Sequence, residues 1–256
     1  MRFFRRLIDF YINASLHIGL AVLALTSISE SALTIPNQEN LLLTIFFGTI
    51  FGYNALKYFD LFSSDISWLS KHRDISIVSV IAFFGAFFFY FSLPMKTQLC
   101  FLAIGFVIAA YPFLRKFGLI KMFLVSFCIT TITVYIPTVN DQQFTADCFF
   151  RFIQRFFIVI SLLIPFEISD SKTDHPSLQT LPQEFGIRPT KIFGMLLLIP
   201  FVLLEFFKTN TSYSVFIVSI TTVLLIHFSS VNNSKYYTSF WVESVPIFWW
   251  LLLYII

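Results

Sequence analysis

Charge is scarce in this sequence. Only 12% of its 256 residues are Asp, Glu, Lys or Arg, whereas 57% are hydrophobic and the mean hydropathy is +0.81. A soluble globular domain carries about 25% charged residues. The shortage excludes an ordinary soluble domain and predicts a polytopic membrane protein. The net charge of +3 is small and its positive residues are scattered, so nucleic acid is not an expected partner.

Cysteine is scarce too, and several common site motifs are missing. The three cysteines are Cys100, Cys128 and Cys148, with no Cys-x-x-Cys pair. This pattern supports neither a disulfide framework nor a zinc site. The sequence also has no phosphate-binding P-loop, no dinucleotide-binding glycine motif and no Ser-His-Asp order of a hydrolase. Any chemistry must therefore come from other residues.

Long apolar segments are abundant, and they predict an all-α transmembrane fold. Windows of about 17 to 25 apolar residues are candidate spans. Nine are present, and the first is interpreted as a transmembrane helix rather than a signal peptide. They cover about residues 10–29, 40–58, 75–93, 97–113, 119–138, 149–166, 191–208, 213–230 and 240–256. We expect a single domain, 1–256, of two four-helix halves plus a ninth helix around a central cavity, with kinks at Pro200 and Pro246.

The basic residues predict the orientation of these spans. With the N-terminus in the cytoplasm, 13 of the 17 Lys and Arg residues fall on the cytoplasmic side. Cytoplasmic segments of membrane proteins are enriched in Lys and Arg. We therefore expect a multi-pass protein, in a cell inner membrane, with its N-terminus inside and its C-terminus outside. The longer polar loops, and the expected site, are then cytoplasmic.

Three acidic residues follow the sixth apolar segment. They are Glu167, Asp170 and Asp174, and they share one face if the helix continues through them. Carboxylates at a helix end suit Mg²⁺, which takes oxygen ligands and commonly binds substrate phosphates as well. The head of a prenyl diphosphate would bind such a metal while its tail lies among apolar helices. The alternative is a solvated loop in which these acids pair with Lys172 and Arg188.

The pattern resembles that of the UbiA-type intramembrane prenyltransferases. In that family an Asp-x-x-Asp-x-x-x-Asp motif ends helix 6 and precedes a Thr-Leu-Pro and a Leu-Gly. Here the corresponding residues are Glu167, Asp170 and Asp174, then Thr180-Leu181-Pro182 and Phe185-Gly186. The resemblance implies that Asp170 and Asp174 bind Mg²⁺ and its diphosphate, with Glu167 in support.

The resemblance also implies which residues hold the diphosphate directly. The family has a Tyr and basic residues after helix 4, where this chain has Tyr111, Arg115 and Lys116. Lys172, between the last two acids, is assigned to the same group. Arg115 and Lys116 are equally explained as residues that fix topology.

The first acidic motif of the family is degenerate here. The family pattern is Asn-Asp-x-x-Asp-x-x-x-Asp, and this chain keeps Asn54 but has Ala55, Tyr58 and Phe62 at the acidic positions. Fewer Mg²⁺ ions can then be held. Lys57 stands within the motif, and we expect it to bind phosphate directly as a point charge. Asn54 and Lys57 are therefore also assigned to diphosphate binding.

Three functions fit these residues. The protein is a prenyltransferase whose site holds fewer metal ions, a non-catalytic isoprenoid- or lipid-binding protein, or a nine-span transporter. The first requires a prenyl diphosphate donor, Mg²⁺ and a lipophilic acceptor that the sequence does not identify. Among other polar residues in the spans, His17 and His227 either face the cavity or bond a neighbouring helix. Glu205 and Lys208 are expected to pair.

Overall fold

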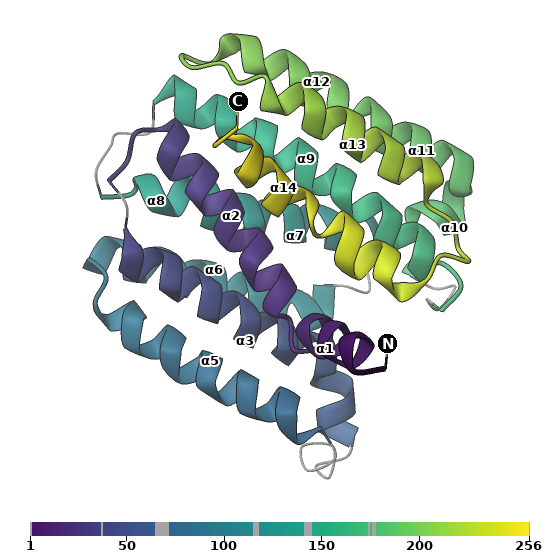
Figure 1. Ribbon diagram of the computed structural model, residues 1–256, viewed down its shortest axis with the longest axis horizontal. Helices are drawn as coiled ribbons and strands as arrows, with labels where there is room; N and C mark the ends of the chain where they lie inside the picture. Colours follow the sequence, from purple (N-terminus) through teal and green to yellow (C-terminus); the bar gives the residue numbers. More distant parts are fainter. Residues whose placement is uncertain are drawn as a thin grey trace.

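The first half of the chain forms one group of helices. The computed structural model describes residues 2–36, 38–64, 72–114, 118–140, 145–173, 175 and 178–255, and the ordered elements in these ranges are all helical. Those of the first half are α1 (Arg2–Asn13), α2 (Leu16–Ala32), α3 (Glu39–Ser64), α5 (Arg73–Phe91), α6 (Met95–Leu114), α7 (Gly118–Thr130), the π-helix η1 (Thr131–Tyr135) and α8 (Ile136–Thr138). Figure 1 shows α3, α5 and α6 together on one side of the bundle.

The second half is built around one long helix. Its elements are α9 (Ala146–Asp170), α10 (Leu181–Phe185), α11 (Ile187–Leu196), α12 (Leu198–Leu203), the 3₁₀-helix η3 (Leu204–Phe207), α13 (Ser214–Phe228), the π-helix η4 (Tyr237–Val242) and α14 (Val245–Leu252). α14 packs against both α2 and α13, so the end of the chain joins the two halves (Figure 1).

The number of membrane-crossing helices is not fixed at nine. In the described ranges, five helical segments are long and apolar enough to cross a membrane, or six if a bent pair counts as one span. They are Glu39–Tyr58, Arg73–Phe91, Ile120–Thr138, Ala146–Asp170 and Ile187–Phe207, with the bent pair Arg5–Asn13 and Leu16–Ala32. Met95–Tyr111 and Ser214–Phe228 are shorter apolar helices. The last predicted span, 240–256, contains only the end of η4 and the short α14.

The first predicted span, 10–29, is not one helix. α1 ends at Asn13 and α2 begins at Leu16, and the two are bent by 62°. Ser15 lies between them in the left-handed backbone region, with φ of 61°. Hydropathy did not predict this break, because it averages over a long window in which apolar residues outnumber Asn13, Ser15 and His17.

The regular helix is interrupted near both prolines that were expected to produce kinks. The first interruption is at Leu197, between α11 and α12, three residues before Pro200. The second is at Glu243 and Ser244, between η4 and α14, and Pro246 is the second residue of α14. A proline cannot donate to the carbonyl four residues earlier, so helices break at these points.

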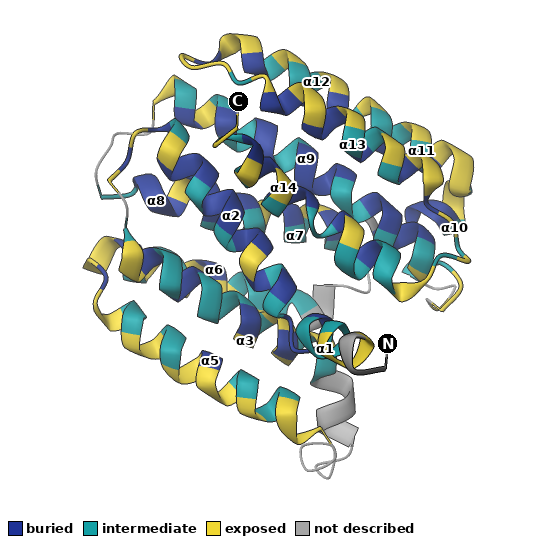
Figure 2. Cartoon of the chain, viewed as in Figure 1, coloured by how far each residue is buried: buried dark blue, intermediate teal, exposed yellow. Residues whose placement is uncertain are grey.

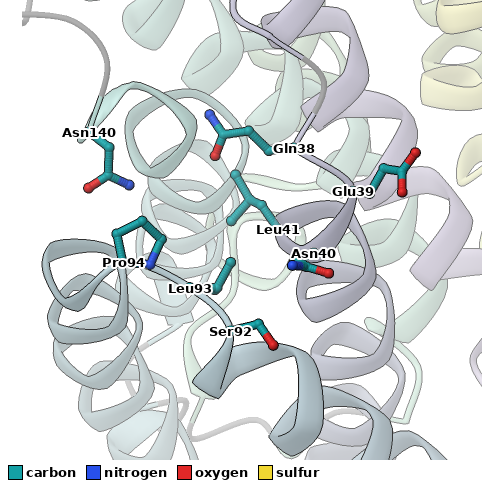
Figure 3. Close-up of a pocket in the computed structure, with 8 residues that line it drawn as sticks. All are labelled: Gln38, Glu39, Asn40, Leu41, Ser92, Leu93, Pro94 and Asn140. Carbon is teal, nitrogen blue, oxygen red and sulfur yellow. The ribbon is translucent and has the colours of Figure 1, made fainter.

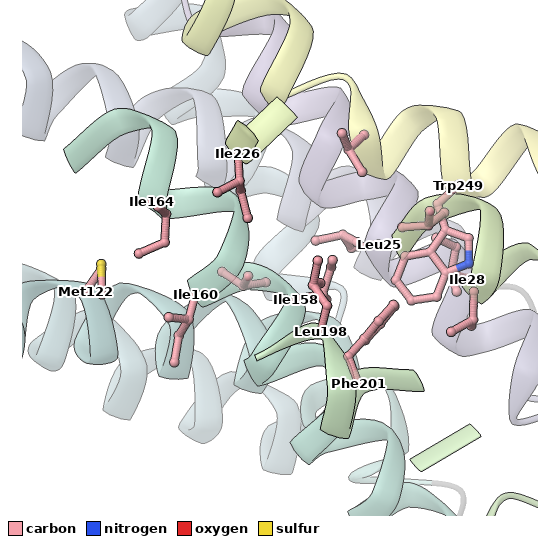
Figure 4. Packing of buried hydrophobic residues seen from close by; sticks show 14 of the residues in the cluster. Leu25, Ile28, Met122, Ile158, Ile160, Ile164, Leu198, Phe201, Ile226 and Trp249 are labelled. Carbon is pink, nitrogen blue, oxygen red and sulfur yellow. The ribbon is translucent and has the colours of Figure 1, made fainter. Parts of the chain in front are cut away.

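The hydrophobic core surrounds α9. In the window around α9, 56% of the residues are buried, compared with 6% for α5. Figure 2 shows this contrast, since α9 is largely dark blue and α5 is mostly teal and yellow. Five residues of α9, including Ile158, Ile160 and Ile164, join Leu25 of α2 and Trp249 of α14 in one cluster (Figure 4). Apolar side chains on α5 therefore face outward, as expected beside lipid.

The helices have two sets of ends. We call one set the Asp170 end. It contains the last residues of α9, the first residues of α7 and α11, and the start of η4 near the N-terminus. The side chain of Asp9 in α1 accepts hydrogen bonds from Lys235 and Tyr236 there, each at 2.7 Å. At the other, the Pro94 end, Gln38 donates to the carbonyl of Pro137 at 3.1 Å. The predicted orientation makes the Asp170 end cytoplasmic.

Candidate functional site

The acidic motif is only partly helical. α9 ends at Asp170, and residues 171–173 form a turn. The expectation that the helix continues through all three acids is therefore wrong, and only Glu167 and Asp170 share it. Asp174 lies outside the described residues. Asp170 is exposed at the helix end, whereas Glu167 is 7% exposed.

Glu167 is held by a lysine that the sequence did not single out for this motif. Lys121 of α7 forms an ion pair with Glu167 across 2.9 Å, and both side chains are largely buried. The pairing expected with Lys172 and Arg188 does not involve Glu167. Lys172 instead donates to the side chain of Asn232. A Mg²⁺ ion at Glu167 would have to share that carboxylate with Lys121.

The loop after the motif is fixed against α7. Gln183 accepts a hydrogen bond from the Thr180 N–H at 3.1 Å and so caps α10, in which Leu181 and Pro182 form the first turn. Gly118 begins α7 beneath this loop. A Cβ atom at Gly118 would lie 2.3 Å from the Leu178 carbonyl oxygen, so only glycine permits this approach. The Thr-Leu-Pro segment therefore anchors the chain that leads away from Asp170.

Tyr53 of α3 lies beside the acidic motif. Tyr53 is 38% exposed. Glu243, Tyr111 and Asp170 all lie within electrostatic reach of its hydroxyl. Residues from α3, α6, α9 and the η4–α14 turn thus converge.

Lys57 follows Tyr53 by one helical turn and shares its face of α3. Its ammonium lies 5.3 Å from the centre of the Tyr58 ring. Lys57 also interacts electrostatically with Glu243, which is partly exposed. We call Tyr53, Lys57, Tyr111, Asp170 and Glu243 the Tyr53 site. It combines one cation, two carboxylates and two phenols.

Asn54 points away from the Tyr53 site. It is 3% exposed, and its side chain accepts from Ser15 at 2.5 Å while donating to the Ala14 carbonyl at 3.2 Å and to Ser79 at 3.0 Å. One amide hydrogen is therefore used at the α1–α2 break and the other on α5. Asn54 holds this break together, and we leave it out of the diphosphate site.

Of the remaining predicted residues, one belongs to the Tyr53 site and the others lie elsewhere or outside the described residues. Tyr111 belongs to the Tyr53 site, whereas Arg115 and Lys116 lie outside the described residues. His17 is a bonded helix-contact residue, because its ring nitrogens lie 2.9 Å from the Tyr11 hydroxyl and 3.0 Å from the Phe240 carbonyl. His227 is exposed at the end of α13.

Sequence reasoning missed Tyr53 and Glu243. Tyr53 directly precedes the Asn54 motif, and its position beside a degenerate motif was a usable signal. Glu243 gave a weaker one, as an isolated acid within the last apolar segment, 240–256. Acids inside membrane segments are costly and mark functional sites by default.

The Tyr53 site fits Mg²⁺ only together with a ligand that brings oxygen atoms. The described residues contain no group of three or more His, Cys, Asp or Glu side chains that could hold a metal ion. Mg²⁺ is usually bound by one or two carboxylates plus substrate phosphates. Asp170 supplies such a carboxylate, and Glu167 is balanced by Lys121. The donor set therefore suits a metal that arrives with a diphosphate.

A hollow at the Pro94 end is unsuited to this chemistry. It measures about 450 Å³ and is lined by Gln38, Glu39, Asn40, Leu41, Ser92, Leu93, Pro94 and Asn140 (Figure 3). None of these residues is basic, so an anionic head would meet only neutral groups and Glu39. It also lies at the opposite end of α3 from Lys57.

The fold has a solved counterpart. A structure described as a UbiA homolog from Archaeoglobus fulgidus bound to GPP and Mg²⁺ matches 96% of this chain and 98% of its own, with a TM-score of 0.60 and 12% sequence identity. No family model and no curated protein matches the sequence. The chain therefore has the helical-bundle fold of a UbiA homolog, and the predicted fold class is confirmed at this level.

Proposed function

We propose that this protein binds a prenyl diphosphate with Mg²⁺ at the Tyr53 site and acts as a membrane prenyltransferase. The observation that carries the proposal is that Tyr111, Asp170 and Glu243 lie within electrostatic reach of the Tyr53 hydroxyl in a UbiA-like fold. The structurally similar UbiA homolog supports the proposal, since that protein was solved with GPP and Mg²⁺. The site is on the cytoplasmic side in the proposed orientation.

The chain's own residues bind and orient the diphosphate. Lys57 attracts phosphate oxygens as a point charge. The hydroxyls of Tyr53 and Tyr111 donate to the same oxygens, and Asp170, with Asp174 from the undescribed segment, offers carboxylate oxygens to the metal. When bound, Mg²⁺ would stabilise charge on the departing diphosphate. The prenyl tail lies among the apolar helices, next to an unidentified lipophilic acceptor.

The replaced acids of the first motif favour a second candidate function. Lys57 stands within that motif and interacts electrostatically with Glu243. A site with fewer metal ligands can hold a diphosphate without ionising it. The non-catalytic alternative is therefore a protein that binds an isoprenoid diphosphate without transferring it.

Binding and turnover assays on purified protein separate these candidates. Labelled prenyl diphosphates of several chain lengths are offered with and without Mg²⁺. Asp170→Asn should abolish metal-dependent binding, whereas Glu184→Gln, an exposed acid in α10 at the same end, should leave it unchanged. Equal binding by wild type and Asp170→Asn would overturn the metal role. Release of diphosphate by the wild type identifies an enzyme, and binding without release identifies the carrier.

A further inference from the structure

A groove separate from the Tyr53 site runs between α11 and α13 at the Asp170 end. Its volume is about 470 Å³, and its lining residues are Ile187, Arg188, Lys191, Ile192, Met195 and His227. The two helices lie side by side here (Figure 1). Two of the lining residues are cations and none is acidic. The groove therefore combines positive charge with apolar walls.

The polar and apolar parts of the groove follow one another along α11. Arg188 and Lys191 lie in the first turns, and Ile192 and Met195 continue the same face toward the middle of the helix. The candidate span begins at Ile187, so the cations stand at the membrane surface and the apolar residues below it. Exposed apolar residues extend this face, with Ile192, Leu196 and Ile199 exposed by 49, 55 and 54%.

The two cations have no acidic partner in the described part of the chain. Lys191 donates to the His227 carbonyl oxygen at 2.7 Å, which holds its ammonium over the end of α13. Arg188 is exposed and forms no ion pair with any residue that the structure describes. An anion between α11 and α13 would therefore meet two donors that no described carboxylate neutralises.

We infer that this groove binds one anionic phospholipid of the adjoining leaflet. The phosphate contacts Arg188 and Lys191, and an acyl chain follows Ile192, Met195 and the exposed face of α11 and α12. Basic pockets between transmembrane helices recognise lipid headgroups by this combination. Two cations in the first turns of a span are also explained by their role in fixing the orientation of the protein in the membrane. The test therefore needs a control cation at the same end of another span, outside the groove.

Arg73 is that control. It is exposed in the first turn of α5, another candidate span that begins at the Asp170 end, and it does not line the groove. The protein is purified in neutral detergent and titrated with phosphatidylglycerol, phosphatidylcholine or inorganic phosphate. Native mass spectrometry then counts the bound molecules. We expect one tightly retained phosphatidylglycerol and no comparable retention of phosphatidylcholine or phosphate.

The variants give graded outcomes. Arg188→Gln should weaken phosphatidylglycerol binding about fivefold, and Arg188→Gln with Lys191→Gln about twentyfold, because each surface charge contributes modestly. Ile192→Ser should weaken it with the charge unchanged, while Arg73→Gln should have no effect. Equal losses in Arg73→Gln and Arg188→Gln would show a topological role only. Equal binding of inorganic phosphate would also overturn the inference, since it makes the acyl track irrelevant.

Discussion

The guanidinium of Arg155, in α9, donates to the carbonyl oxygen of Leu25, in α2, across 2.8 Å. It also donates to Ser29 at 3.3 Å and lies 5.0 Å from the centre of the Trp249 ring in α14. One buried side chain thus joins the two halves of the bundle and the last helix. It forms no ion pair with a described carboxylate, so its contacts depend on shape more than on charge.

The shape of Arg155 should therefore be more important than its charge. Lys keeps the charge but cannot reproduce the planar fork, so Arg155→Lys should lower the free energy of unfolding by about 1–3 kcal/mol. Met removes the charge from an apolar site, and Arg155→Met should change stability by less than about 1 kcal/mol. Thermal unfolding in detergent measures both. A greater loss of unfolding free energy in Arg155→Met than in Arg155→Lys would show that the charge itself is required.

The predicted pair of Glu205 and Lys208 is confirmed, and it is more deeply buried than expected at a membrane interface. Glu205 is 1% exposed and also accepts from Gln154 at 2.8 Å and from the Ser212 N–H at 2.7 Å. Glu205→Ala leaves a buried lysine without its counter-ion, which should cost about 3–5 kcal/mol of unfolding free energy. The double variant Glu205→Ala with Lys208→Met should recover much of this loss. A double variant no more stable than Glu205→Ala would contradict the assignment.

Gly118 should not tolerate a side chain. The Cβ of Gly118→Ala would meet the backbone oxygens of Leu178 and Gln179 at 2.3 and 2.4 Å, so the loop between Asp170 and α10 must move. Overpacking of this kind costs about 1–3 kcal/mol. Diphosphate affinity should fall as well. Gly105→Ala on α6 is the matched control, because a Cβ there meets nothing within 4 Å. Equal behaviour of the two variants in unfolding and binding would show that the loop adapts.

Asn54 should affect stability rather than ligand affinity. Asn54→Ala removes two hydrogen bonds at the α1–α2 break and one to Ser79 of α5, and we expect a loss of about 1–3 kcal/mol in unfolding free energy. Affinity for prenyl diphosphate, corrected for the folded fraction, should stay unchanged. The reverse result, normal stability with lost affinity, would restore Asn54 to the diphosphate site.

Lys57 and Glu243 should act on the ligand with opposite signs. Lys57→Met removes a cation from the Tyr53 site and should weaken diphosphate binding about tenfold, as expected for a hydrogen bond to a charged group. Glu243→Gln removes a negative charge and should strengthen it. The control is Lys96→Met, an exposed lysine at the Pro94 end. Titrations with and without Mg²⁺ check the result, and weaker binding in Glu243→Gln would contradict this electrostatic account.

The sequence predicted the helices well and their interruptions unevenly. Hydropathy located most of the apolar helices because it reports burial away from water over many residues, although in the described ranges only five or six segments are long enough to cross a membrane. Pro200 and Pro246 marked two breaks because proline lacks a donor. The break at Ser15 involves no proline or glycine, and it depends on hydrogen bonds to Asn54, which is 39 residues away. Local composition carries no record of such a contact.

The site shows the same division. Spacing drew attention to Asp170, since acids at a helix end are unusual in an apolar chain. Tyr53 and Glu243 could not be connected from sequence, because they come together only when α3 packs near the η4–α14 turn. The resemblance assigns Asn54 to the ligand, whereas the proposed site contains Tyr53, one residue earlier. A shift of one residue rotates a helical side chain by about 100° and moves it to another face.

The 62° bend between α1 and α2 shortens the first crossing of the membrane. α2 has 17 residues and α13 has 15, so they extend about 25 and 22 Å. The hydrocarbon core of a bilayer is about 30 Å thick. Such mismatch is relieved by thinning of the adjacent bilayer. Thinning of the bilayer beside α2 and α13 would bring lipid headgroups closer to the middle of the bundle, so a long-tailed amphiphile would enter the bundle from the side without leaving the membrane.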